Sequence, residues 1–174
     1  DTTLLVLGEL DDAHKAIVLE AADRFSAIGA GATGPASAEA YVQAAELYRG
    51  AGDAEKRRVA LDQVATRGDG PLLYAAIVAL AGQQADQGDV DGAIARLRPF
   101  EADSDRFVTQ DAIAQIGTLL ETAGRKPEAI EQYNRFLEKH PETPMAVEIR
   151  ARLARLGAPA APAPEAPVTP GTGG

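Results

Sequence analysis

The sequence predicts an all-α protein assembled from repeated pairs of helices. Apolar residues recur at three- and four-residue steps along most of the chain, which is the period of an amphipathic helix. Gly52, Gly88 and Gly124 follow one another at intervals of 36 residues. Each stands where one helix must end in a left-handed residue before a short turn into the next helix. A fixed interval of this length is typical of helical repeat proteins.

The leading helix begins near Asp11 and Asp12, which can cap it, and ends at the glycines of GAGATG, residues 29–34. Its apolar residues keep the helical period: Ala16, Ile17, Ala21, Phe25 and Ile28. The same period predicts further helices over 36–49, 53–67, 72–87, 90–101, 105–122, 127–139 and 145–156. No alternating stretch favours a strand instead.

The apolar positions repeat with the same step as the glycines. The pairs are Ile77 and Ile113, Leu80 and Ile116, Ala93 and Ala129, Leu97 and Tyr133, and Phe100 and Phe136. We therefore expect structural copies over about 36–71, 72–107 and 108–142. A lead helix and glycine-rich loop (1–35) precede them, and a capping helix (143–157) follows. Residues 158–174, rich in Ala and Pro with one charge, are expected to form a disordered, inert tail.

These features resemble the tetratricopeptide repeat (TPR) family, whose unit carries the pattern W-x2-L-G-x2-Y…A-x3-F…P. The third copy fits best, through Ile113, Ile116, Gly117, Leu120, Ala129, Tyr133 and Pro141. The second copy departs at Gln84, where an aromatic residue or Leu is usual, and the first places Arg57 where a small residue should lie at the helix crossing. The resemblance implies a right-handed α-solenoid of about three TPR-like helix pairs.

The period of 36 residues is longer than that of the usual TPR unit, which is about 34 residues. The chain is similar to divergent TPR domains of bacterial envelope proteins. These include Tol-Pal coordinators, outer-membrane-assembly lipoproteins and YfgM-type ancillary translocon subunits. The resemblance implies a periplasmic or envelope-associated location, and it leaves room for a membrane tether upstream of Asp1. A cytoplasmic location stays open, because a chain without cysteine fits either compartment.

Charge and motifs disfavour several classes of function. The net charge of −9 repels phosphate backbones, so nucleic acid is not an expected partner. GAGATG matches a dinucleotide-binding pattern but follows a helix rather than a strand. The stretch QGDVDG, 87–92, has Gln at the first ligand position of a calcium loop. We expect no cofactor at either.

Catalytic and metal sites are not expected either. His14 and His140 have no His or Cys partner at helical spacing, so a zinc site is not predicted. Ser26, Ser37 and Ser104 lack the G-x-S-x-G context of a hydrolase nucleophile. An enzyme is disfavoured, and no catalytic residue is assigned.

The function class that the sequence leaves is the binding of another polypeptide. The TPR resemblance implies that the first helices of the pairs line a concave surface that holds a peptide or a partner's helix. The residues expected there are Val42, Glu46, Arg49, Ala75, Val78, Asp111, Ala114 and Thr118. Arg49 is the one cation among them, so an apolar or weakly basic polypeptide is expected rather than an acidic tail.

Two alternatives stay open. Ala75, Val78 and Gly82 can instead belong to a helix buried on all sides, with the lead helix filling the groove. The chain can also be a self-associating structural module, cytosolic or exported, whose apolar faces make homo-oligomer contacts and bind no peptide.

Overall fold

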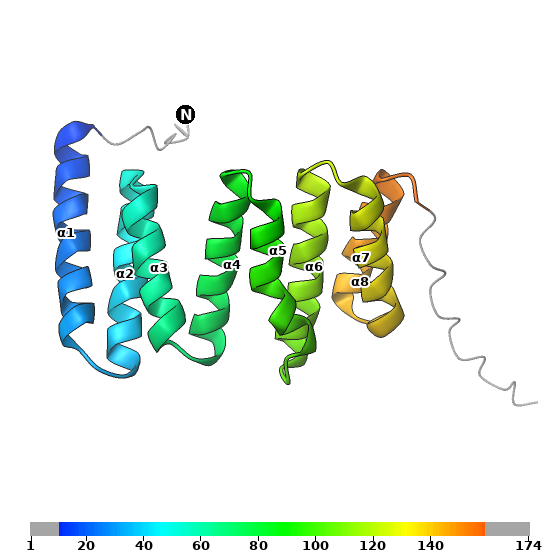
Figure 1. The fold of residues 1–174 in the computed structure, drawn as a ribbon, viewed down its shortest axis with the longest axis horizontal. Coiled ribbons are helices and arrows are strands. Elements are labelled where there is room, and N and C mark those ends of the chain that lie inside the picture. The colour runs from blue at the N-terminus through cyan, green and yellow to red at the C-terminus, as the bar shows by residue number, and fades with distance from the viewer. Residues whose placement is uncertain (1–10, 159–174) are drawn as a thin grey trace, which may run out of the picture. The chain divides into compact units, whose positions relative to one another are not determined.

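The computed structural model describes residues 11–158, and that part of the chain is helical throughout, without strands (Figure 1). The α-helices are α1 (Asp12–Gly31), α2 (Pro35–Ala51), α3 (Ala54–Arg67), α4 (Gly70–Asp86), α5 (Val90–Leu97), α6 (Arg106–Thr122), α7 (Lys126–Lys139) and α8 (Pro144–Arg155), with a 3₁₀ segment, η1 (Arg98–Ala102), after α5. The all-α prediction is confirmed for these residues. The expected tail after Ala158 lies outside the described range.

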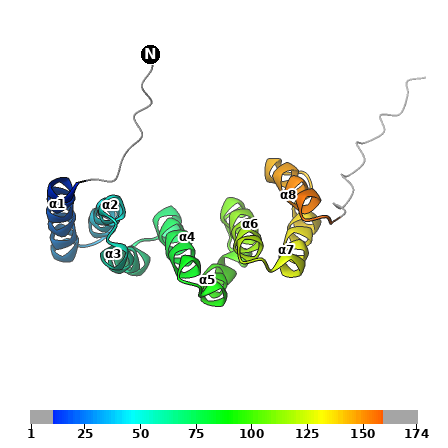
Figure 2. The same ribbon diagram turned by 90° about the horizontal axis from the view of Figure 1, so that it is seen from above.

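The chain forms two compact units, residues 1–83 and 84–174, whose boundary falls inside α4. In the first unit α1 and α3 both pack on α2, and the three stand side by side in both views (Figures 1 and 2). In the second unit α7 packs on α6 and α8 packs on α7. Short connections between consecutive helices make antiparallel neighbours the natural arrangement within each unit.

One turn recurs at the ends of α2, α4 and α6. Gly52, Gly88 and Gly124 have φ of +80°, +91° and +74°, a conformation open to glycine because it has no Cβ. The residue after each glycine donates its backbone N–H to a carbonyl in the last helical turn. Those bonds are Asp53 to Tyr48 at 2.9 Å, Asp89 to Gln84 at 3.1 Å and Arg125 to Leu120 at 2.9 Å. The predicted role of the three glycines is confirmed.

Aspartate side chains cap the N-termini of several helices. The Asp11 carboxylate accepts the N–H of His14 at 2.9 Å, as predicted for the lead helix. Asp53 and Asp89 cap α3 and α5 in the same way. Each carboxylate satisfies a backbone N–H that has no partner within its helix. The matching position before α7 is Arg125, whose side chain instead pairs with Glu128.

The core of the first unit is made of small and aromatic residues. It comprises Ala22, Tyr41, Ala44, Ala45, Tyr48, Ala60, Leu61, Val64, Ala76 and Leu80. Gly29 lies against the ring of Tyr41, and a Cβ built on Gly29 would come within 2.8 Å of that ring. A glycine at this position therefore allows α1 to approach α2 closely.

The second unit has a larger-residue core around Tyr133 and Phe136, both fully buried. Ile113, Ile116 and Leu137 are buried with them. Gly117 on α6 faces Tyr133 on α7, and a Cβ built there would overlap the ring. The small residue predicted at this crossing thus makes room for an aromatic side chain.

The end of one helix differs from the sequence expectation, and the crossing residue of the first copy departs from the other copies as expected. The helix expected over 90–101 ends at Leu97 and tightens into η1, because Pro99 supplies no N–H for a regular α-helical bond. Ala93 and Ala129 are completely buried, but Arg57, at the matching position on α3, is only half-buried, and its Nε has no partner among the described residues.

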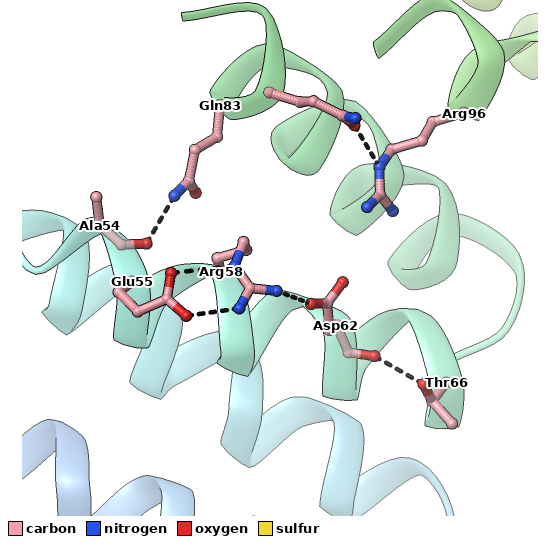
Figure 3. Close-up of polar contacts among 8 residues, drawn as sticks. Ala54, Glu55, Arg58, Asp62, Thr66, Gln83 and Arg96 are labelled. Atoms are coloured by element: carbon pink, nitrogen blue, oxygen red, sulfur yellow. Dashed lines mark hydrogen bonds and ion pairs between the residues drawn. The ribbon is translucent and has the colours of Figure 1, made fainter. Parts of the chain in front are cut away.

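Polar contacts link and brace α3 (Figure 3). The Gln83 amide on α4 donates to the carbonyl oxygen of Ala54 at 2.6 Å, which joins α4 to the start of α3. Along α3 the Arg58 guanidinium pairs with Glu55 and, at 2.8 Å, with Asp62. Pairs of this kind, one turn apart on an exposed helix face, add a few tenths of a kcal/mol each.

We predict that Gly117→Ala destabilises the second unit by about 1–3 kcal/mol, because the added methyl group must displace a fully buried Tyr133. Gly82→Ala is the matched control, since this helical glycine has open space around its Cβ direction. It should stabilise the chain by about 0.5–1 kcal/mol through helix propensity. Urea unfolding followed by circular dichroism measures both. Equal effects of the two changes would contradict the close packing at Gly117.

We also predict a pH dependence from His140. Burial lowers the pKa of His140, and the charges of Arg106 and Lys139 act in the same direction. As pH falls below about 6.5, the unfolded chain binds a proton that the folded chain resists, so stability falls. The free energy of unfolding should therefore be lower at pH 5.5 than at pH 7.5. His140→Gln should reduce that difference, and an undiminished difference in this variant would assign the effect to other groups.

Candidate functional site

The strongest candidate site lies in the first unit, where α1, α2 and α3 meet around Asp23. The Asp23 carboxylate accepts hydrogen bonds from the Tyr48 hydroxyl at 2.6 Å and from Lys56 Nζ at 2.8 Å. Tyr48 Oη also lies 3.2 Å from the Ser26 hydroxyl. One residue from each helix therefore meets at a single carboxylate, which holds the surrounding surface in place.

The electrostatics of this cluster favour fixed charges. The hydrogen bond from Lys56, followed by that from Tyr48, holds the pKa of Asp23 below its usual value. The same contact with Asp23 raises the pKa of Lys56. Burial, with a further contribution from Asp23, raises the pKa of Tyr48. All three shifts keep the groups in their neutral-pH protonation states, so the cluster is suited to structure and binding rather than proton transfer.

A groove of about 390 Å³ opens beside this cluster. It is lined by Ser26, Tyr41, Tyr48, Glu55, Lys56, Val59, Ala60 and Gln63, and we call it the tyrosine groove. Val59 is 46% exposed, although it is a large apolar residue. The Lys56 ammonium lies 5.5 Å from the centre of the Tyr48 ring, within reach of a cation–π contact. The groove thus combines an apolar floor with charged groups at its rim.

This composition is that of a surface that binds apolar side chains. Tyr41 and Tyr48 are only 7% and 4% exposed, so they form the floor of the groove and offer a ligand a small part of each ring, and Val59 is the exposed apolar side chain. Tyr41 and Tyr48 are already packed in the core on one side, and their positions are held before any ligand arrives. A rigid surface loses less entropy on binding than a mobile one.

The residues expected on a concave face lie elsewhere. On α2, Val42 is half-buried against the core, and exposed Glu46 and Arg49 form an ion pair at 2.9 Å. On α4, Ala75 is exposed and Val78 is half-buried. None of these residues lines the tyrosine groove.

The remaining expected residues belong to the second unit. Asp111, Ala114 and Thr118 are half-buried on α6, and the Thr118 hydroxyl donates to the Ala114 carbonyl oxygen at 3.1 Å. The groove was not expected from the sequence, because the repeat pattern accounts for Tyr41 and Tyr48 by packing alone. The available signal was an apolar residue, Val59, directly after the charged residues 55–58 of α3.

The second unit has a smaller cavity of about 110 Å³ between charged side chains of α5, η1 and α7. Three arginines line it, but each has a carboxylate partner. Arg125 lies 2.6 Å from Asp91, Arg98 lies 3.4 Å from Glu101, and Arg135 lies 3.6 Å from Glu101. Because these charges are already compensated, the cavity is a weak candidate for an anion site.

The motifs considered in the sequence have structural roles. Gly29 and Gly31 of GAGATG end α1, and the Gly29 carbonyl oxygen accepts the Ser37 hydroxyl at 2.6 Å. In QGDVDG, Gly88 makes the turn and Asp89 caps α5. Among residues 11–158, no group of three or more potential ligands is arranged to hold a metal ion. Over the same residues, no helix combines the length and apolar character needed to cross a bilayer.

Comparison with known protein families, with curated proteins and with solved structures finds no match to this chain.

We predict that Tyr48→Phe destabilises the first unit by about 1 kcal/mol, since it removes the hydrogen bond to Asp23 but leaves the ring. Tyr41→Phe is the control, because the Tyr41 hydroxyl has no hydrogen-bond partner within residues 11–158, and it should be close to neutral. Urea unfolding of the two variants measures the difference. A Tyr48→Phe variant as stable as the wild type would show that the hydroxyl network adds nothing to the fold.

Proposed function

We propose that this chain is a non-enzymatic scaffold or adaptor that binds another polypeptide through the tyrosine groove. The observation that carries the proposal is the combination of two core-anchored tyrosine rings with an exposed Val59 in one groove. Helical proteins commonly recognise partners in this way, by accepting the apolar face of an amphipathic helix. This groove replaces the concave face as the first choice of binding surface.

The proposed partner is an amphipathic segment with a net positive charge. Its apolar residues would cover Tyr41, Tyr48 and Val59, and its basic residues would be attracted by a chain of net charge −9. Glu55 is the acidic residue that lines the groove, but it already pairs with Arg58, as Asp23 does with Lys56, so the attraction would come from the net charge of the chain rather than from one contact. Electrostatic attraction of this kind acts mainly on the association rate and weakens with salt.

The recurring turns at Gly52, Gly88 and Gly124 support a TPR-like repeat as the scaffold. Through the same resemblance we propose an envelope or periplasmic location, with the partner taken from proteins of secretion or envelope assembly. These finer parts of the proposal rest on the sequence resemblance and not on the groove.

The test is site-specific photo-crosslinking from position 59 in the source cells, followed by mass spectrometry of the adducts. A heterologous polypeptide is expected, and its identity and compartment test the proposed location. Position 78 serves as the second probe, because adducts from Val78 alone would favour the concave face of the TPR resemblance. Adducts only within the chain, at both positions, would overturn the proposal.

A substitution test in solution complements the crosslinking. Val59→Asp should weaken binding of the captured segment more than about tenfold, since it places a charge on the apolar floor. It should leave the fold intact because Val59 is already exposed. Ala95→Asp, an exposed site on α5, is the matched control and should bind as the wild type does. Equal affinities of the two variants, measured by titration calorimetry, would remove the groove from the interface.

A further inference from the structure

The connection between α3 and α4 contains an Asp–Gly step whose two reactive groups have no partner. Asp69 and Gly70 are both exposed. Among residues 11–158, the Asp69 carboxylate makes no hydrogen bond or ion pair, and the Gly70 N–H donates to no acceptor. Gly70 has φ of +46°, and no other group lies within 4 Å of the position that a Cβ on it would occupy. The carboxyl group and the backbone nitrogen are therefore both free and uncrowded.

An Asp–Gly step can rearrange without an enzyme. The glycine backbone nitrogen attacks the protonated side-chain carboxyl group of the aspartate, so that an N–Cγ bond forms, the Cγ–OH bond breaks, and the hydroxyl leaves as water with the N–H proton. The product is a succinimide ring. Water then opens the ring, and where it breaks the bond from nitrogen to the backbone carbonyl carbon, the chain continues through Cβ and Cγ as isoaspartate. Glycine favours the attack because it has no Cβ to obstruct the approach of its nitrogen.

The sequence contains one other Asp–Gly step, Asp91–Gly92 in the first turn of α5, and there both groups are held. The Gly92 N–H donates to the Asp89 carboxylate at 2.9 Å, and the Asp91 carboxylate lies 2.6 Å from the Arg125 guanidinium. The side chain of Asp91 is 84% exposed, so the two steps do not differ in access to solvent. They differ in whether the nucleophile and the carboxyl group are already bonded.

The start of α4 also differs from the capped helix starts described above, where an aspartate carboxylate accepts a backbone N–H. At α4 the N–H groups of Leu72 and Leu73 donate to the backbone carbonyl oxygen of Asp69, at 3.1 and 3.3 Å. The main chain thus satisfies these donors, and the Asp69 side chain is not required for capping. This is the local reason why its carboxyl group stays free to react.

We propose that Asp69–Gly70 is a site of spontaneous isoaspartate formation in the folded protein, and that Asp91–Gly92 is protected from it. The rearrangement would insert one methylene group into the backbone where α4 begins. It would also displace the carbonyl oxygen that accepts the N–H groups of Leu72 and Leu73, so the first turn of α4 should loosen. The α-carboxylate that it frees is the group that isoaspartyl methyltransferases modify. Neither Asp–Gly step lines the tyrosine groove, so this inference is independent of the proposed function.

The experiment incubates the full folded chain at pH 5 and physiological temperature and then digests it with trypsin. Trypsin cleaves after Lys and Arg, so both steps lie in one peptide, residues 68–96, and are compared within it. Electron-transfer fragmentation distinguishes isoaspartate from aspartate at each position, and labelling with an isoaspartyl methyltransferase measures the total. Isoaspartate should accumulate at position 69 at least about tenfold faster than at position 91, because α5 must open locally before Asp91–Gly92 can react.

Two controls separate the fold from the local sequence. In urea both steps should react at similar rates, since both are then unfolded. Asp69→Glu keeps the charge but would require a larger ring, so position 69 should stay unmodified in this variant, and circular dichroism checks that it remains folded. Equal rates at the two steps in the folded chain overturn the proposal, as does a folded chain that forms no isoaspartate at position 69. A difference that persists in urea also overturns it, because the flanking sequence would then be the cause.

Discussion

The hydrogen bond that closes each glycine turn is the contact on which the rest of the fold depends. Where α2 ends, the N–H of Asp53 returns to the Tyr48 carbonyl oxygen, and this is possible because Gly52 adopts a positive φ. The bond satisfies a carbonyl at the helix end and reverses the chain within a few residues. The two flanking helices must then lie next to each other, where they can bury their apolar faces without contacts from distant parts of the chain.

Packing between neighbouring helices follows from a pairing of glycine with tyrosine. Gly29 lies against Tyr41 in the first unit, and Gly117 lies against Tyr133 in the second. Removing the Cβ lets an aromatic ring fill the space between two close helices, which keeps the interior dense although the chain contains no tryptophan. The same arrangement therefore recurs in both units.

The units differ in what surrounds their tyrosines. Tyr133 is fully buried and donates to Glu121 at 2.8 Å, whereas Tyr48 donates to Asp23 beside an ion pair that stays about half exposed. Burying a charge is costly, which is consistent with the partly exposed position of the Asp23–Lys56 pair on that side of the first unit.

Helix positions and turns could be predicted from the sequence because they depend on local properties. Glycine at 52, 88 and 124 permits the left-handed turn, and the apolar period identifies the faces that Ile113, Ile116 and Tyr133 bury. The break at Pro99 is equally local, although the helix was expected to continue through it.

The groove was decided by the tertiary structure alone. Asp23 and Lys56 are 33 positions apart, and nothing in the spacing of either residue predicts that they meet at Tyr48. Exposure of Val59, Ile17 and Val147 depends likewise on which neighbouring helix covers each face. A helical period says that a face is apolar, but only the packing of helices determines whether that face is covered, because burial is a property of neighbours and not of the residue itself.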